Sequence, residues 1–385
     1  MTEKLYYADS HMAEFSARVL SCEQGEKGYL TVLDKTAFFP EGGGQAADTG
    51  FIGESAVLDT QEKSGVIYHL CDKALETGME YNCRIDWQQR LMRMQSHSGE
   101  HIVSGIAHRL YGCENVGFHM GVDGMTIDFS VELNWDELME IERRANEAVR
   151  LNLPIRAWLP EAEELKALDY RSKLELTEDV RIVEIEGIDL CACCAPHVSY
   201  TGEIGAVKIL DSQRHRGGVR LTLICGRAAE EDYRAKQESV TAISQLLSAK
   251  REDIAPAVQR ILRENRETKE RCDRLSMAMV KMIAEAQAEA SGSICIFNDI
   301  LDEIAQRELV NLLMEKCGAL SCVFCGSDEE GWRYIIGSKS IDLRKHTKLI
   351  NSAIDGRGGG KAQMIQGRAA GKRSTIEENI KGLVF

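Results

Sequence analysis

The sequence lacks the features of a membrane or secreted protein. No apolar run approaches the roughly 20 residues that a membrane-spanning helix needs, and the N-terminus, MTEKLYYADS, has no apolar signal core. The 13 cysteines are scattered apart from a dense group at 191–194, which disfavours a disulfide framework. We therefore expect a cytoplasmic protein with reduced cysteines and no membrane partner.

Positive charge is also scarce. The chain has 47 Lys and Arg residues against 61 Asp and Glu, a net charge of −14, which argues against general binding to polyanions. Binding depends on local patches, however. Basic residues outnumber acids over 208–227 and again over 333–373. These two zones predict a specific contact with a polyanion.

The chain is long enough, at 385 residues, for two or three domains. Residues 1–90 alternate short apolar runs with Gly and Asp turns, a pattern typical of small antiparallel strands in a barrel-like unit. From residue 88 the apolar spacing is helical, and a second helix is predicted over 135–152. Strand-like runs return between 180 and 226.

Residues 228–290 are charged, apolar at intervals and nearly free of glycine. They predict two helices, interrupted at Pro256, in antiparallel or coiled-coil pairing. We expect this spacer to drive homodimerisation, and a helical hairpin within one chain is the alternative. Residues 291–385 return to mixed α/β structure, with a glycine-rich loop in GRGGGKAQMIQGRAAG and a final helix.

Two short clusters of metal-type ligands are the most informative motif. His97 and His101 lie four residues apart in the predicted helix, so both imidazoles face one side. Cys193 and His197 have the same spacing, but Pro196 disfavours a helix there, and we place this pair on a tight turn after a strand. Three imidazoles and one thiolate suit a tetrahedral Zn²⁺.

Spacing alone leaves other interpretations open. Cys191 and Cys194 rival Cys193 as the sulfur ligand. Four protein ligands also suit a structural zinc, whose coordination is closed. Cys193 beside His197 could instead be a nucleophile, but the histidine pair would then have no role.

These motifs resemble the alanyl-tRNA editing domain. The two pairs match that family's zinc motif, although its second half usually reads Cys-Gly-Gly-Thr-His and here reads Cys-Cys-Ala-Pro-His. LDKTAFFPEGGGQAADTG resembles the family's glycine-rich motif, IDWQQRLMRMQSHSGEH its approach to the first histidine pair, and TGEIG the segment after the second. The resemblance selects Cys193 over Cys191 and Cys194 as the ligand.

The glycine-rich C-terminal segment resembles the DHHA1-type domain that ends alanyl-tRNA synthetases and some phosphodiesterases. The resemblance covers nearly the whole chain and begins at the editing module, which implies a freestanding, long-form editing protein of the AlaX type. The fold implied is α+β, in four parts: a small β-barrel with the glycine-rich motif (1–90), an α/β editing domain with the zinc (91–227), a helical spacer (228–290) and a tRNA-binding α/β domain (291–385).

The activity implied is hydrolysis of the ester in Ser-tRNA or Gly-tRNA built on alanine tRNA, with Zn²⁺ as cofactor. A site that admits alanine rejects glycine by only about 1–3 kcal/mol, so a second, hydrolytic site is needed. An aminoacyl ester is already activated, and its hydrolysis needs a positioned water, a polarised carbonyl and a fixed substrate. No side chain is assigned as the catalytic group.

The resemblance also assigns contacts to the substrate and the tRNA. Thr36 is expected to hydrogen-bond the serine hydroxyl, although an ordinary β-branched strand residue is the plainer interpretation. Gly43 and Gly44 would let the backbone approach a ligand, with a hairpin turn as the alternative, and Gln45 would hold the substrate or the loop. The backbone of the second glycine-rich run, 356–360, could approach phosphate oxygens, with a flexible surface loop as the alternative, and the tRNA contacts are expected at Arg357, Lys361 and Arg368.

Two rival functions use the same motifs. In the first, a structural zinc supports an RNA-binding protein without hydrolytic activity. In the second, the chain is a phosphodiesterase related through its last domain. Such enzymes carry an Asp-His-His tripeptide, and this sequence has none, which disfavours the second rival.

Overall fold

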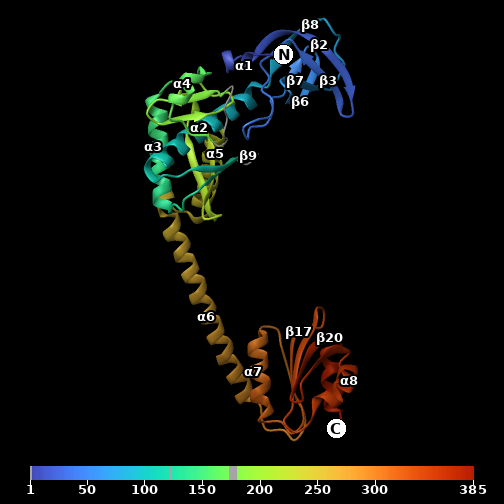
Figure 1. Cartoon of the computed structure of the whole chain (residues 1–385). Helices are drawn as coiled ribbons and strands as arrows, with labels where there is room; N and C mark the ends of the chain where they lie inside the picture. The colour runs from blue at the N-terminus through green and yellow to red at the C-terminus, as the bar shows by residue number, and fades with distance from the viewer. Residues whose placement is uncertain (1, 122–123, 173–179) are drawn as a thin grey trace. The chain divides into compact units, whose positions relative to one another are not determined.

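The computed structural model describes residues 2–121, 124–172 and 180–385 (Figure 1). The chain separates into two compact units, residues 1–242 and 243–385. Helices and sheets are mixed throughout, as predicted. Within the described ranges, no helix has the length and apolar character needed to cross a membrane. The finer division into four parts stays a prediction.

Six strands between residues 14 and 85 pair in a closed antiparallel barrel. The other sheets of the first unit are open. Alternate side chains point inward, so Ala17, Val19, Leu33 and Val57 are buried in one cluster. Outside the ring, β1 (Glu3–Lys4) and β4 (Lys35–Thr36) form a short parallel pair, and α1 (Leu5–Ala8) contacts β4. The ring order is β2 (Glu14–Gly25), β3 (Gly28–Leu33), β7 (Val66–Cys71), β6 (Ser55–Lys63), β5 (Gly50–Ile52) and β8 (Glu80–Ile85), which returns to β2.

The helix expected from residue 88 is α2 (Trp87–Tyr111). Asp86 caps its N-terminus by accepting a hydrogen bond from Gln89 N, and Gly112 ends it with a left-handed φ of 64°. The helix expected over 135–152 is α3 (Trp135–Leu151), which begins with a capping box. α2 packs against α3, and both helices contribute to the largest core cluster of the first unit.

Two further sheets complete the first unit. One has the order β14 (Val207–His215), β15 (Gly218–Cys225), β10 (Gly124–Phe129) and β9 (Asn115–Gly121). The other has the order β11 (Ile155–Trp158), β12 (Ile182–Ile185) and β13 (Asp189–Ala192). In the chain, the short α4 (Ala162–Ala167) lies between β11 and β12, and η1 (Thr201–Ile204) follows β13. The first of the strand-like runs expected between 180 and 226 is therefore a hairpin, β12–β13.

The predicted spacer is helical, but its break lies elsewhere. α5 (Arg227–Leu247) ends at Ser248, whose φ is 47°, and α6 (Ile254–Ala286) begins after η2 (Arg251–Asp253). Pro256 therefore lies in the first turn of α6 and does not interrupt the segment. Proline is tolerated there, because the first N–H groups of a helix have no partner within it. Homodimerisation through this segment stays a prediction.

The second unit contains a five-stranded sheet. α7 (Glu303–Met314) packs against β17 and β18, α8 (Leu343–Ala353) against β19 and β20, and α9 (Arg373–Lys381) against β16. The sheet order is β16 (Ile294–Asn298), β17 (Ser321–Ser327), β18 (Gly331–Gly337), β20 (Met364–Ala369) and β19 (Gly356–Gly360). Only β16 and β17 pair in parallel.

The glycine-rich run that we expected to be a loop is the edge strand β19, and this expectation was wrong. Glycine has a low strand propensity, but packing outweighs it here. A Cβ on Gly358 would lie 2.2 Å from Tyr334 Oη, and one on Gly360 would lie 2.3 Å from Met364 O. The strand pairs with β20 because these positions have no side chain.

A buried ion pair fastens the glycine-rich segment of the first unit to α2. Arg90 and Asp48 have side chains 0% and 1% exposed. Arg90 donates from Nε to Asp48 Oδ2 at 2.8 Å, and its Nη2 donates to the same oxygen. Arg90 Nη1 donates to Ser10 O at 3.0 Å. Asp48 Oδ2 also accepts a hydrogen bond from Phe39 N at 2.7 Å. Each residue of the pair is therefore also hydrogen-bonded to the backbone.

We expect Arg90→Met to lower the free energy of unfolding by about 3–5 kcal/mol, because it leaves the buried Asp48 carboxylate with only the longer 3.6 Å ion pair to Arg93. Urea unfolding of the full chain, followed by tryptophan fluorescence, measures the change. The matched control is Lys166→Met, which removes an exposed pair with Glu163 and should cost less than about 1 kcal/mol. Equal losses in the two variants would contradict the prediction.

Candidate metal centre

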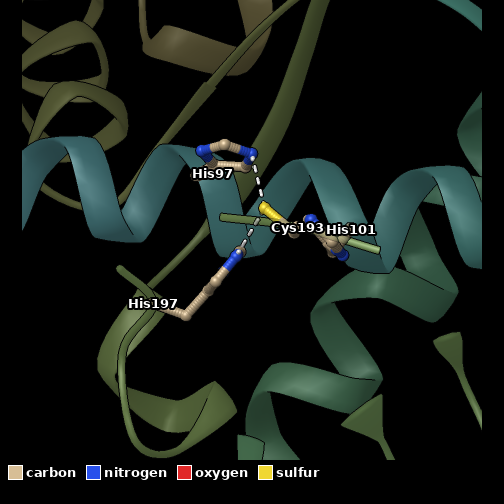
Figure 2. Close-up of side chains that lie close together, drawn as sticks. All are labelled: His97, His101, Cys193 and His197. Carbon is tan, nitrogen blue, oxygen red and sulfur yellow. Dashed lines mark hydrogen bonds between the residues drawn. The ribbon is translucent and has the colours of Figure 1, made fainter. Parts of the chain in front are cut away.

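The structure brings together the four side chains that the sequence predicted as metal ligands (Figure 2). His97 and His101 come from α2, and Cys193 and His197 from the turn after β13. Their ligand atoms all lie within 4.8 Å of one another. Cys193 Sγ is 3.6 Å from His97 Nε2 and 3.3 Å from His197 Nε2. The three histidines are buried.

Glycine and arginine let the two segments meet. A Cβ on Gly105 of α2 would lie 2.5 Å from Ile188 O, so glycine admits the β12–β13 hairpin against the helix. Arg181 braces the turn by donating from Nη1 to Cys193 O at 3.0 Å and to Ala195 O at 2.9 Å. These residues position the ligands, and nothing in their sequence pattern singled them out.

His101 has a charged partner outside the cluster. Its Nδ1 lies 2.8 Å from Asp189 Oδ2. Arg171 donates to both oxygens of that carboxylate, from Nε at 2.7 Å and from Nη2 at 2.9 Å. A carboxylate that accepts from Nδ1 fixes the tautomer that presents Nε2 to a metal, and raises the basicity of the ligand.

The other two histidines have neutral partners. His97 Nδ1 lies 3.1 Å from Gln45 Oε1, and His197 Nδ1 lies 3.0 Å from Ser98 Oγ. Each of the three imidazoles therefore has one nitrogen engaged outside the cluster, which leaves the other nitrogen for the centre. Such outer partners are the usual support of histidine ligands.

The donor atoms of the cluster suit a metal cation. Burial raises the pKa of the Cys193 thiol, but His97 and His197 outweigh it and hold that pKa well below its usual range. Burial lowers the pKa of His197 to about 3. For His101, burial lowers the pKa, but the hydrogen bond to Asp189 outweighs burial and keeps the pKa raised. A thiolate with imidazoles is the donor set of zinc, and the residues present fit that ion.

The two rival thiols lie outside this group of four. Cys191 is buried and groups with His101 and Asp189, and burial raises its pKa to about 11. Cys194 is exposed, and its Sγ would lie 3.4 Å from a Cβ on Gly43. Zinc binding and the choice of Cys193 stay predictions, although the geometry favours that choice.

A cavity of about 350 Å³ opens onto the cluster. His97, His101 and Cys193 line it, so the centre can meet a molecule from outside. A purely structural zinc would need no such access. Further walls come from Tyr7, Gly43, Gly44, Phe118, Arg171 and Arg181.

The glycine-rich motif forms one wall as a tight turn. Gly42 and Gln45 exchange backbone hydrogen bonds at 3.1 and 3.0 Å, and Gly43 and Gly44 have φ values of 60° and 82°. Two positive φ values in succession are typical of a type I′ hairpin turn. A Cβ on Gly44 would lie 2.7 Å from the ring of Phe118. The glycines therefore satisfy the turn and also allow this close approach.

Gln45 is buried beside the cluster at 1% exposure. Its Oε1 faces His97, and its Nε2 has no hydrogen-bond partner among the residues that the structure describes. The side chain thus supports a predicted metal ligand, and it also leaves one buried donor at the edge of the site.

Thr36 is not among the described residues that line the cavity. It is fully buried, with its Oγ1 2.9 Å from His69 Nε2, and it accepts from Phe38 N at 3.1 Å. Burial lowers the pKa of His69 to about 4. That ring is therefore neutral, donates from Nδ1 to Thr31 O at 3.1 Å, and accepts from Thr36. The contact between Thr36 and a serine hydroxyl stays a prediction.

Glu100 is a cavity residue that the sequence interpretation missed. It lies between the two histidines of α2, and its Oε2 is 3.9 Å from His101 Nε2. Its Oε1 accepts from Ser104 Oγ at 2.6 Å. Its position between His97 and His101 on one helix could have identified it from the sequence.

The predicted tRNA contacts lie in the second unit. Arg357 and Arg368 pair across β19 and β20, and Lys361 follows β19 directly. All three are exposed.

Comparison with known proteins finds two family models that match parts of the chain. Residues 180–226 match the family described as the threonyl and alanyl tRNA synthetase second additional domain. Residues 2–89 match class II (A) tRNA synthetases. Both matches lie in the first unit, and both are to tRNA synthetases.

Within that group, the relatives are alanine–tRNA ligases. The ligase of Pyrococcus furiosus is 32% identical over 99% of this chain and 43% of its own length, and that of Pyrococcus abyssi is 31% identical over 100% and 43%. The chain is related to the alanine–tRNA ligases over nearly its whole length, which confirms the resemblance. It spans less than half the length of these relatives.

The C-Ala domain from Aquifex aeolicus alanyl-tRNA synthetase aligns with 25% of this chain and 99% of its own, at 14% identity and a TM-score of 0.21. That score is too low to establish a shared fold.

We expect one zinc per chain, and we expect Asp189→Asn to weaken zinc binding by about 10–100-fold, because the outer carboxylate orients His101. Elemental analysis and competition with a chelator measure stoichiometry and affinity. The matched control is Cys191→Ser, which removes a neighbouring thiol and should leave both unchanged. Protein purified without chelator and free of metal would refute the zinc site, and an unchanged affinity would refute the role of Asp189.

Proposed function

We propose that this chain hydrolyses the ester that joins serine or glycine to alanine tRNA. One observation carries the proposal: His97, His101 and Cys193 line a cavity of about 350 Å³ in a chain related to alanine–tRNA ligases. Sites for small ligands usually measure about 300–1,000 Å³, so this cavity suits an amino acid joined to a ribose.

Zinc, when bound, would polarise the ester carbonyl or a water molecule. The chain's own residues hold and orient that centre. Asp189 and Gln45 turn His101 and His97 toward it. The glycine turn and Phe118 confine the substrate on one side. Because the ester is already an activated acyl group, orientation and the exclusion of competing conformations supply much of the acceleration.

The proposal extends to the partner and the compartment. We infer that alanine tRNA binds through basic residues of the second unit, Arg357, Lys361 and Arg368, because an exposed basic surface meets phosphates. A cytoplasmic protein, present as a homodimer through α5 and α6, fits this role. The rival function, an RNA-binding protein with a structural zinc, is favoured by the four protein ligands, and it is disfavoured by the cavity that reaches three of them.

We expect the purified chain to release serine and glycine from alanine tRNA and to spare alanine. The measurement follows free amino acid from Ser-tRNA, Gly-tRNA and Ala-tRNA built on the same tRNA. Cys193→Ala should reduce release to background, and Cys191→Ser should retain it. Tight tRNA binding without release of any amino acid would support the rival function instead.

We expect Thr36→Val to weaken serine release more than glycine release, because valine keeps the shape of threonine and removes only its hydroxyl. The matched control is Thr36→Ser, which retains the hydroxyl that contacts His69 and should retain the preference for serine. Single-turnover rates on both esters give the comparison. An equal loss on both would show that the hydroxyl acts through His69 and Phe38, not on the substrate.

A further inference from the structure

Glu100 is the one carboxylate among the described residues that line the cavity at the candidate metal centre. It lies between His97 and His101 on α2, and it is 3% exposed. Its Oε2 is 3.9 Å from His101 Nε2, the ring nitrogen turned away from Asp189. Little water screens a buried charge, so this carboxylate can attract a cation that enters the cavity.

The Glu100 side chain is held in place from both the helix and a strand. Its Oε1 accepts a hydrogen bond from Ser104 Oγ at 2.6 Å, one turn further along α2, and another from Asn115 Nδ2 at the start of β9. Asn115 Nδ2 also donates to Ser104 Oγ at 3.2 Å, and both of these residues are buried. A side chain fixed by packing and hydrogen bonds presents its charge at a defined position, as a binding site requires.

The two arginines of the cavity wall direct their charge to the protein itself. Arg171 donates to both oxygens of the Asp189 carboxylate. Arg181 donates from Nη1 to two backbone carbonyl oxygens of the turn that carries Cys193. The wall thus combines cations that support the candidate metal centre with a single carboxylate, at Glu100, that can recognise a cationic ligand.

We propose that Glu100 binds the α-ammonium group of the amino acid in the ester, where the choice of an aminoacyl ester rests on the proposed function. The ester link uses the carboxyl group of the amino acid, so the α-amino group is left, and it is ordinarily protonated near neutral pH. Its nitrogen is attached to the carbon next to the carbonyl. A carbonyl placed at the centre therefore brings the ammonium group beside it.

Electrostatics gives this ammonium group a need for an anion. Zn²⁺ bound by one thiolate and neutral imidazoles would leave the centre with a net positive charge, which repels a second cation nearby. The Glu100 carboxylate, 3.9 Å from His101 Nε2, offsets that repulsion on the side of the cavity. Hydrogen bonds between charged groups are also stronger than those between neutral groups.

This contact would select the class of ester that the site accepts. An acylated amino group has no charge, and it is larger than an ammonium group. A site built to hydrogen-bond a polar group rejects analogues that lack it, because the buried partner is left without the ligand. Glu100 would therefore admit esters of free amino acids and exclude N-acylated and peptidyl esters. It would not distinguish one amino acid side chain from another.

A different role for Glu100 makes a different prediction. On zinc-binding helices of other hydrolases, an acid beside two histidine ligands is a general base. A general base is needed for the chemical step and not for binding. A partner of the ammonium group is needed for binding, and only when the amino group is free. Binding of compounds that cannot be hydrolysed therefore separates the two roles.

The test measures the binding of two such compounds to the full chain by calorimetry. One is serine joined by an amide bond to an adenosine analogue that has an amino group in place of the ribose hydroxyl. The other is the same compound with an N-acetyl group on the serine. The parent chain should bind the free amine at least about tenfold more tightly, which is the usual worth of a hydrogen bond between charged groups.

Glu100→Gln keeps the shape of the side chain and removes its charge, so it should bind the two compounds alike, with the zinc content and at least the Tm of the parent chain. Glu100→Asp keeps the charge and should retain a preference for the free amine. The matched control is Glu142→Gln on α3, whose carboxylate accepts hydrogen bonds from Lys208 Nζ and Ile209 N. Glu142 does not line this cavity, and this variant should show the parental preference.

Four results would overturn the proposal. The parent chain binds both compounds equally, or neither. Glu100→Gln keeps the preference while it loses hydrolysis of Ser-tRNA, which is the result for a general base. Glu100→Gln loses zinc, which is the result for a metal ligand. Glu100→Gln is milder than Glu100→Asp, which shows that shape matters and charge does not. Because neither compound has an ester, a chain that shows the preference but releases no serine refutes the proposed hydrolysis alone.

Discussion

Two opposite charges, buried together, hold the candidate site in register. The Asp48–Arg90 pair ties the glycine-rich segment to α2. Each of these two segments contributes side chains to the site. α2 carries His97 and His101, and the segment carries Gln45, which orients His97. A buried pair tolerates little displacement, because separated charges in a low-dielectric interior are costly. The pair therefore keeps the Gln45 amide within reach of His97.

The opposite side of the centre depends on a second pair of charges. Arg171 holds Asp189, and Asp189 holds His101. The absence of a side chain at Gly105 lets the hairpin that carries Asp189 lie against α2. The centre is thus assembled from a helix, a turn and a hairpin, each positioned by its own buried contacts. This arrangement preorganises the ligands before any ion binds, which is the condition for a defined coordination geometry.

Much of this architecture followed from local patterns. The helical spacing from residue 88 and the second helix expected over 135–152 agree closely with α2 and α3. Where the prediction was wrong, tertiary contacts had overridden local preference. Pro256 begins a helix and does not break one, because proline fits a first turn. Residues 356–360 form a strand, because β20 and Tyr334 approach positions that have no side chain.

The sequence alone establishes that His97 and His101 share a helix face, since a spacing of four residues is close to one turn. It also determined that a thiol and an imidazole lie together near Pro196. The packing of the folded chain was needed to show that these two pairs meet, that Glu100 faces the same cavity, and that the Thr36 hydroxyl contacts His69. Spacing within one element is set by backbone geometry. Contacts across 96 residues, such as that between His97 and Cys193, depend on how separate elements pack, which no local pattern records.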